Sequence, residues 1–155
     1  MTFRPATVDD VPAILPLVGK ICALHQAWDA DRFAFKPNVV EMYRGWLSQR
    51  ATDPRSVLIV ADQEGVVVGY IVGTIESEIP IYWTPECGWI HDLWVEETYR
   101  NEGVARQLVM LAVERFKSIG VTQIRLQTAT ANTIARELFV KCGFRDSTVE
   151  MLMTV

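Results

Sequence analysis

The apolar positions of this chain switch repeatedly between a period of two and a period near 3.6, which predicts alternating strands and helices. Alternating or β-branched runs predict strands at 2–6, 57–61, 66–74, 88–95 and 121–128, and two closing strands at 144–147 and 150–155. Helical spacing predicts helices from Asp9 or Asp10 to about Trp28, and over 38–49, 103–120 and 132–141. The predicted element order is therefore βααβββαβαββ.

The turns between these elements have their own signals. Asp62-Gln63-Glu64-Gly65 separates two β-branched runs, which predicts a hairpin. Gly120 follows the last apolar position of the 103–120 pattern, as expected of a helix C-terminal cap. No Gly/Ser linker, charge block or internal repeat interrupts the pattern, so we expect residues 1–155 to form a single layered α/β domain.

Composition supports a folded chain and limits its partners. Half of the 155 residues are hydrophobic, 10% are aromatic and the formal net charge is −4. A mildly acidic balance does not favour a nucleic-acid or anionic-membrane binder, so any polyanion must be held locally. No apolar run approaches the roughly 20 residues of a membrane helix, and MTFRPATVDD has no apolar secretion region, so we expect a cytoplasmic protein.

Cysteine and histidine spacing gives no metal or disulfide signal. Cys22, Cys87 and Cys142 are widely separated and no C-x-x-C occurs, while His25 and His91 lack ligand-like spacing. We therefore expect neither a disulfide framework nor a metal site.

An anion-binding turn is the strongest chemical signal in the sequence. Tyr99-Arg100-Asn101-Glu102-Gly103-Val104-Ala105-Arg106 joins the 88–95 strand to the 103–120 helix. The free N–H groups of a helix N-terminus can hold a phosphate or pyrophosphate. Gly103 permits close approach and positive φ, and Arg100 and Arg106 add charge. The same spacing also fits an ordinary strand-to-helix turn, and it is neither G-x-G-x-x-G nor a Walker loop.

In this context the chain resembles the GNAT family of acetyl-CoA-dependent N-acyltransferases over nearly its whole length. Arg100 to Ala105 matches the family's R/Q-x-x-G-x-G/A loop, Ile90-His91-Asp92-Leu93-Trp94-Val95 is similar to the strand before it, and Asn132-Thr133-Ile134-Ala135 through Phe139 to Gly143-Phe144 is similar to its N-x-x-A…L-Y…G-F helix. The resemblance implies a GNAT-like fold with a central, twisted mixed sheet flanked by about four helices. It also implies acetyl-CoA as co-substrate and no metal.

The resemblance assigns the cofactor-binding residues. The backbone of Leu93 and Val95 would pair with the pantetheine arm as though it were an extra strand between splayed strands. The pyrophosphate would be held by the amides from Asn101 to Arg106, namely Asn101, Glu102, Gly103, Val104, Ala105 and Arg106. Asn132 would contact the pantetheine or phosphate region, and Ala135 and Phe139 would flank the arm and thiol. Asn101 and Glu102 depart from the usual pattern, and Glu102 places a carboxylate near phosphates.

Acetyl transfer needs a neutral amine, so a base must take a proton from the ammonium form of the acceptor. His91 is the expected base, directly or through water, with Asp92 orienting it or acting alone. Both residues also fit structural roles, His91 fixed by hydrogen bonds and Asp92 bonded to backbone. The Val95 amide is the expected donor to the oxyanion.

The departing thiolate lacks the family's usual donor, because Phe139 stands where relatives have Tyr. Tyr99 and Cys142 are alternative donors, and release unassisted or through water is a third option. No base lies at recognisable spacing from Cys87 or Cys142, which argues against a covalent cysteine intermediate.

Two loops combine aromatic rings with carboxylates and are expected to bound the acceptor site. They contribute His25, Trp28, Asp29, Asp31 and Phe33, and Glu76, Glu78, Tyr82, Trp83 and Glu86. This mixture suits a small cationic primary amine, acetylated by direct attack in a ternary complex. A peptide or protein N-terminus, a non-catalytic acyl-CoA-binding module and an interaction protein that kept only the scaffold remain alternatives. The apolar run Ile79–Trp83 also fits a homodimer interface.

Overall fold

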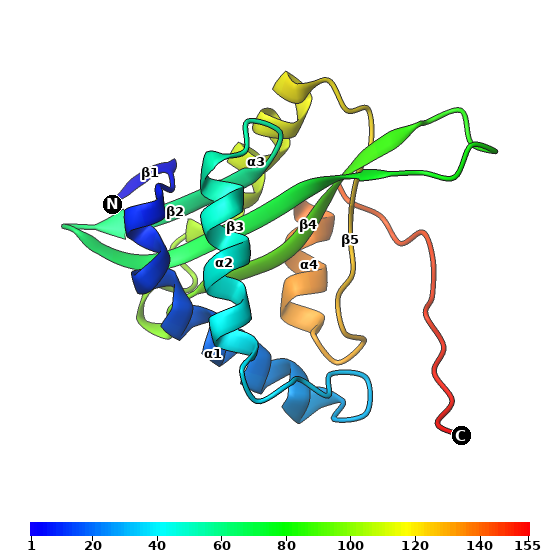
Figure 1. Cartoon of the computed structure of the whole chain (residues 1–155), viewed down its shortest axis with the longest axis horizontal. Coiled ribbons are helices and arrows are strands. Elements are labelled where there is room, and N and C mark those ends of the chain that lie inside the picture. Colours follow the sequence, from blue (N-terminus) through cyan, green and yellow to red (C-terminus); the bar gives the residue numbers. More distant parts are fainter.

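Nine regular elements form where apolar periodicity places them in the computed structural model, which describes residues 1–155 (Figure 1). Short 3-10 turns at Val8–Asp10 and Glu97–Tyr99 precede α1 and α3. The strands and helices are β1 (Thr2–Pro5), α1 (Val11–Trp28), α2 (Val39–Thr52), β2 (Val57–Gln63), β3 (Val66–Ser77), β4 (Glu86–Val95), α3 (Val104–Ile119), β5 (Ile124–Leu126) and α4 (Thr133–Lys141).

The strands form one sheet in the order β1-β2-β3-β4-β5. Neighbours are antiparallel except β4 and β5, which are parallel, so the predicted mixed sheet is confirmed. The predicted hairpin joins β2 to β3: Glu64 and Gly65 have φ of 54° and 88°, and the Gly65 N–H donates to Asp62 Oδ1 at 2.7 Å.

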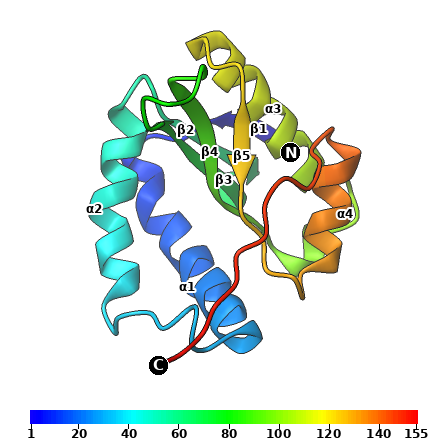
Figure 2. The ribbon, with the colours of Figure 1, turned by 90° about the vertical axis from the view of Figure 1, so that its right-hand side faces the viewer.

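Helices cover both faces of the sheet (Figure 2). On one face α1 and α2 pack Ile14, Val18 and Leu47 against strand residues such as Val72. On the other, α3 and α4 pack over residues such as Ile71, with Phe116 fully buried. The four helices and the two-sided core agree with the predicted α/β class.

The C-terminal residues contradict the predicted closing strands at 144–147 and 150–155. No strand follows α4, and the observed order is βααβββαβα. Val149, Met151, Met153 and Val155 alternate as a strand would, yet each is more than 80% exposed. An alternating pattern shows that a segment can form a strand, but a strand also needs a partner to pair with. β5 has only three residues and offers a short edge for pairing.

The segment Val8–Trp28 is long and apolar enough to cross a membrane by length and composition alone, contrary to the expectation from the sequence. In this structure Ile14, Val18 and Ile21 are buried in the core against the sheet. Lys20, on the same helix, forms an ion pair with Glu96. The segment therefore contributes a face of the folded domain.

Candidate active site

The edge of β4 nearest β5 carries peptide groups that no neighbouring strand pairs with. The Glu96 N–H donates to the Val68 carbonyl on β3 at 2.8 Å. Because hydrogen bonding alternates along an antiparallel pair, the peptide groups of Leu93 and Val95 face away from β3. On that side β5 pairs only with Gly88, Trp89 and Ile90. Beyond Ile90 the two strands separate, and the Leu93 and Val95 peptide groups have no strand beside them.

A bulge in β4 turns two consecutive polar side chains to the same face. Val72 pairs with Asp92 and Gly73 with Ile90, so His91 is an extra residue on β4. His91 meets the Trp46 ring of α2 edge-on, with centroids 5.3 Å apart. Asp92 also points toward the α1/α2 layer, but it lies beside the Tyr43 and Tyr70 side chains.

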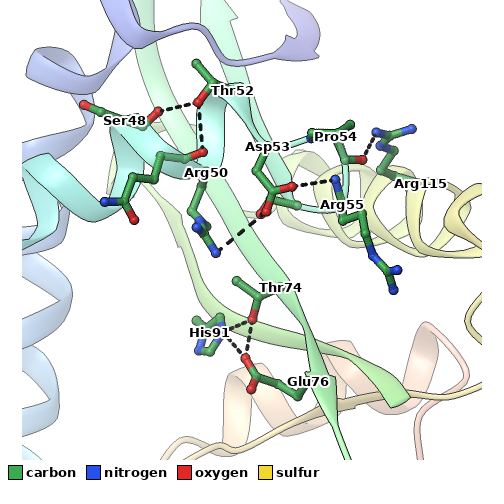
Figure 3. Close-up of polar contacts among 12 residues, drawn as sticks. Ser48, Arg50, Thr52, Asp53, Pro54, Arg55, Thr74, Glu76, His91 and Arg115 are labelled. Carbon is green, nitrogen blue, oxygen red and sulfur yellow. Dashed lines mark hydrogen bonds and ion pairs between the residues drawn. The ribbon is translucent and has the colours of Figure 1, made fainter. Parts of the chain in front are cut away.

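His91 is bound to a threonine and a glutamate of β3 (Figure 3). Its Nε2 lies 2.6 Å from Thr74 Oγ1 and 3.7 Å from Glu76 Oε1, and Thr74 Oγ1 donates to Glu76 Oε1 at 2.6 Å. Burial lowers the pKa of His91, Glu76 acts to raise it, and Arg50 acts to lower it. The net lowering favours the neutral imidazole at pH 7, the form that can accept a proton.

Asp92 occupies a separate, buried group of titratable side chains. It is 7% exposed, and burial raises its pKa to about 6, against the hydroxyls of Tyr43 and Tyr70. Its Oδ2 and the Tyr70 hydroxyl have no hydrogen-bond partner. Burial and the charge of Asp92 also raise the pKa of Cys22 to about 11. No hydrogen bond joins Asp92 to His91, so Thr74 and Glu76, rather than Asp92, hold the His91 ring.

The predicted anion-binding turn has the backbone that the sequence indicated. Asn101 and Gly103 are left-handed, with φ of 65° and 82°, and Gly103 is the N-cap residue of α3. A Cβ placed on Gly103 would meet nothing within 4 Å, so the space before α3 is open. Glu102 and Arg106 are exposed, while Val104 is buried beneath the turn and Ala105 is partly buried.

The Arg100 side chain binds other groups of this chain. Its Nε donates to the Val95 carbonyl at 2.9 Å, and its guanidinium lies 4.9 Å from the centroid of the Trp94 ring. It also approaches Glu97 at 3.7 Å. These contacts fix the end of β4. Arg106, the other arginine of this turn, is exposed and forms no ion pair within the chain.

A cavity of about 90 Å³ lies where β4 and β5 separate. His91 and Leu93 line it from β4, Trp28 from α1, and Asn132, Ala135 and Phe139 from the region of α4. Asn132 Oδ1 caps α4 by accepting from the Ala135 N–H at 3.2 Å, and Phe139 packs edge-on against Phe144. Neither Tyr99 nor Cys142, the alternative proton donors, is among its lining residues.

The carboxylates expected around the acceptor have different surroundings. Glu78 pairs with Arg125, and Glu86 pairs with Arg55 at 2.7 Å. Asp29 Oδ1 accepts from the Arg32 N–H, and Asp31 accepts from the Thr154 hydroxyl. Tyr82 and Trp83 are exposed at the tip of the β3–β4 connection, Trp83 completely. Glu76 is therefore the carboxylate of this set that lies at His91.

A larger cavity, of about 390 Å³, lies elsewhere, where the end of β1 meets the end of α2. Its lining includes Arg4, Arg50 and Arg115 but none of the predicted site residues. The chemistry of the strand-separation cavity matches the sequence motifs, so we place the candidate site there. No group of three or more His, Cys, Asp or Glu side chains in the chain is arranged to hold a metal ion.

Sequence reasoning missed Thr74 and Arg50 as neighbours of His91. Thr74 is part of a β-branched strand, a pattern that reads as sheet structure and carries no functional signal. Arg50 extends from the end of α2 toward the Thr74–His91 contact (Figure 3). Both neighbours depend on how β3 pairs with β4 and where α2 crosses them.

The fold and motifs agree with the comparison to known families. Residues 22–144 match the Acetyltransferase (GNAT) family, and the chain therefore belongs to this family. N-alpha-acetyltransferase 30 of Saccharomyces cerevisiae is 29% identical over 117 residues, which cover 75% of this chain and 64% of that protein. The chain thus spans less than two thirds of this relative's length.

Solved structures share the fold at low sequence identity. A mutant of the BH1408 protein from Bacillus halodurans matches with a TM-score of 0.85 and 22% identity, covering both chains completely. Aminoglycoside N-acetyltransferase AAC(6')-Iy, whose structure is a complex with CoA, matches with a TM-score of 0.74 and 14% identity, covering 99% of this chain and 93% of that one.

Proposed function

We propose that this protein is an acetyl-CoA-dependent N-acetyltransferase that transfers an acetyl group to a primary amine by direct attack in a ternary complex. The observation that carries the proposal is the edge of β4 at Leu93 and Val95, which has no strand beside it and lies next to the cavity that His91 lines. Family membership and relatives named as N-acetyltransferases support the same reaction.

Acetyl-CoA would occupy the separation between β4 and β5. The Leu93 N–H and carbonyl and the Val95 N–H would face the pantetheine arm as a strand edge does, while Arg100 occupies the Val95 carbonyl. The amides from Asn101 to Arg106 would hold the pyrophosphate at the N-terminus of α3, with charge from Arg106. Ala135 and Phe139 would flank the arm and thiol, and the free amide group of Asn132 would face it. Backbone dipoles thereby reconcile an anionic co-substrate with a chain of net charge −4.

His91 would accept a proton from the acceptor ammonium, leaving a neutral amine. The amine nitrogen then forms a bond to the thioester carbonyl carbon, and the carbon–sulfur bond breaks. The Val95 N–H would stabilise the oxyanion formed in between. The attacking nitrogen then loses its second proton, which passes through water to the departing thiolate, because Phe139 has no proton to give. His91 returns the first proton to solvent. The balance is one acetyl group transferred and one proton released.

The proposed acceptor is a small cationic amine. Glu76 is half exposed beside His91, and Trp46 and Trp28 supply aromatic surface near the same residue. The similar fold of an aminoglycoside N-acetyltransferase is consistent with this class. A peptide or protein N-terminus is the second candidate, favoured by the yeast relative named N-alpha-acetyltransferase 30. A non-catalytic acyl-CoA-binding module is the third, since Phe139 replaces the usual tyrosine.

An amine panel distinguishes these candidates. Aminoglycosides, polyamines, amino acids and peptides with free N-termini would each be incubated with acetyl-CoA and examined by mass spectrometry for a gain of one acetyl group. We expect acetylation of a small cationic amine, a loss of about 10²-fold or more in kcat for His91→Gln, and little change for the control Glu114→Gln, at an exposed position on α3 that does not line the cavity. Acetyl-CoA binding without product from any amine would contradict the enzymatic proposal and favour the binding module.

We also propose a homodimer in which the exposed run from Ile79 to Trp83 contacts a second copy. Ile79, Ile81, Tyr82 and Trp83 are all more than half exposed on the β3–β4 connection. Contiguous exposed apolar side chains of this kind mark association surfaces. The connection projects from the body of the sheet, where a second molecule can reach it (Figure 1).

A further inference from the structure

The Thr74 hydroxyl has a single proton and lies between two groups that are both within hydrogen-bond distance. It is 2.6 Å from Glu76 Oε1 and 2.6 Å from His91 Nε2 (Figure 3). A carboxylate can only accept, so the hydroxyl proton goes to Glu76. The lone pairs of the same oxygen then face His91 Nε2, which must carry a hydrogen to complete the second bond. A neutral imidazole protonated on Nε2 has its free lone pair on Nδ1.

We propose that Glu76 and Thr74 are positioning residues that hold His91 in the Nε2–H tautomer and so make Nδ1 the nitrogen that accepts the proton of the acceptor ammonium. The inference rests on the proposed function for its role in catalysis. The tautomer itself follows from the hydrogen bonds among Glu76, Thr74 and His91. In the transfer, the N–H bond of the ammonium breaks, its electron pair stays on the amine nitrogen, and the proton forms a new bond to Nδ1. The resulting imidazolium keeps its Nε2–H bond to Thr74, with the Glu76 charge 3.7 Å away.

The bulge makes this arrangement possible. His91 has no partner on β3, whereas Thr74 pairs with Trp89 two residues earlier on β4. The extra residue turns the imidazole toward the face that carries Thr74 and Glu76, and the edge-on Trp46 ring packs against it from α2. Thr74 is itself 6% exposed, so water does not compete for its hydroxyl. The contact is therefore built by packing.

Two oppositely charged groups face His91 and should shift its titration in opposite directions. They are Glu76, on β3, and Arg50, on α2, while His25 lines the same cavity from α1. Removing the carboxylate in Glu76→Gln should lower the pKa of His91, because the Glu76 charge acts to raise it. Removing the guanidinium in Arg50→Gln should raise it. If Glu76 and Arg50 did not act on the His91 ring, neither substitution would change the pKa of His91.

Nitrogen NMR of histidine-labelled protein tests the inference without needing an active enzyme. The chain has only two histidines, and His25→Gln assigns the remaining signals to His91. We expect neutral His91 to be protonated on Nε2, its pKa to fall in Glu76→Gln and Thr74→Val, and Thr74→Ser to restore it. The acidic limb of the kcat/KM profile should shift in the same directions, to lower pH in Glu76→Gln and to higher pH in Arg50→Gln.

Two results would overturn the inference: protonation of His91 on Nδ1, or a His91 pKa that is the same in wild type, Glu76→Gln and Thr74→Val. If NMR gives the expected tautomer and shifts but no amine is acetylated, the side-chain arrangement stands and the proposed function fails. If acetylation occurs with an Nδ1–H tautomer, the function stands and the positioning role fails.

Discussion

Asn101 and Gly103 hold the turn before α3 in the left-handed region, and a Cβ placed on Gly103 would meet nothing within 4 Å. Gly120 is left-handed at the other end of the same helix, with φ of 102°, and its Cβ position is equally open. The two glycines therefore form a matched pair. One is at the proposed pyrophosphate site and the other is remote from it.

Replacing Gly103 by alanine should weaken acetyl-CoA binding by at least about tenfold, because the new Cβ enters the space that the pyrophosphate would occupy. Gly103→Ala and Gly120→Ala should each lower the free energy of unfolding by about 1–2 kcal/mol, since both force alanine into the left-handed region. Calorimetric titration and denaturant unfolding of both variants make the comparison. Equal acetyl-CoA affinity in the two variants would show that the cofactor lies elsewhere.

Asp92 gives a stability signal with an unusual sign. Burial raises its pKa from 3.8 to about 6, so between these values the folded state binds more protons than the unfolded state. Stability from this group therefore falls as pH rises from about 4 to about 6 and stays low above that range. Asp92→Asn removes the titration. The free energy of unfolding of wild type, relative to this variant, should fall across that window by up to about 3 kcal/mol.

Denaturant unfolding of both proteins at half-unit pH steps measures this difference. The comparison isolates Asp92, because Asp10 and Asp62, whose pKa values are lowered by Arg4, titrate in both proteins. A difference that rises with pH in this window would mean that Asp92 is stabilised as a carboxylate in the folded protein.

At the scale of elements, α4 combines a structural cap with a wall of the cavity. Asn132 Oδ1 accepts from the Ala135 N–H, which leaves the side-chain NH2 group free. Asn132→Ala should lower the free energy of unfolding by about 1 kcal/mol through loss of the cap. Asn132→Asp keeps an acceptor for the cap and should retain stability, yet weaken acetyl-CoA binding because the NH2 donor is gone.

Thermal unfolding and calorimetry separate the two effects of Asn132. Unchanged acetyl-CoA affinity in Asn132→Asp would show that Asn132 caps α4 but does not bind the co-substrate. Normal stability in Asn132→Ala would show that the cap contributes little to α4.

Element positions follow closely from local patterns where a turn residue and a periodic run agree. The β2–β3 hairpin and the end of α3 at Gly120 are examples, since each depends on a residue that reaches positive φ. The prediction of two closing strands was wrong, because residues 149–155 have the alternation of a strand but no partner strand in this chain. The sequence predicts His91 as a site residue but gives no signal for Thr74, because the contact between them depends on a bulge and on the pairing of β3 with β4.

At the scale of the whole molecule, two apolar segments remain uncovered: the run from Ile79 to Trp83 and the C-terminal residues 149–155. If the first contacts a second copy, Trp83→Glu should convert a dimer to a monomer in light scattering at micromolar concentration. Its stability should be unchanged within about 0.5 kcal/mol, since Trp83 is fully exposed within one copy. Ile134→Glu, another exposed apolar position, on α4, is the matched control and should leave the mass unchanged.

A monomeric wild type would contradict the proposed interface. A dimer that persists in Trp83→Glu and dissociates when residues 149–155 are removed would place the interface at the C-terminal segment instead.

Binding of acetyl-CoA in the separation between β4 and β5 is the property on which the proposed reaction most directly depends. Calorimetric titration of the wild-type protein with acetyl-CoA, CoA and ADP, at one protein concentration, tests this claim, with thermal stability as a parallel readout. We predict that acetyl-CoA and CoA bind and stabilise the fold and that ADP binds much more weakly, because it lacks the pantetheine arm that pairs with Leu93 and Val95. A folded protein that binds neither acetyl-CoA nor CoA would contradict the account and leave this chain with the family's scaffold alone.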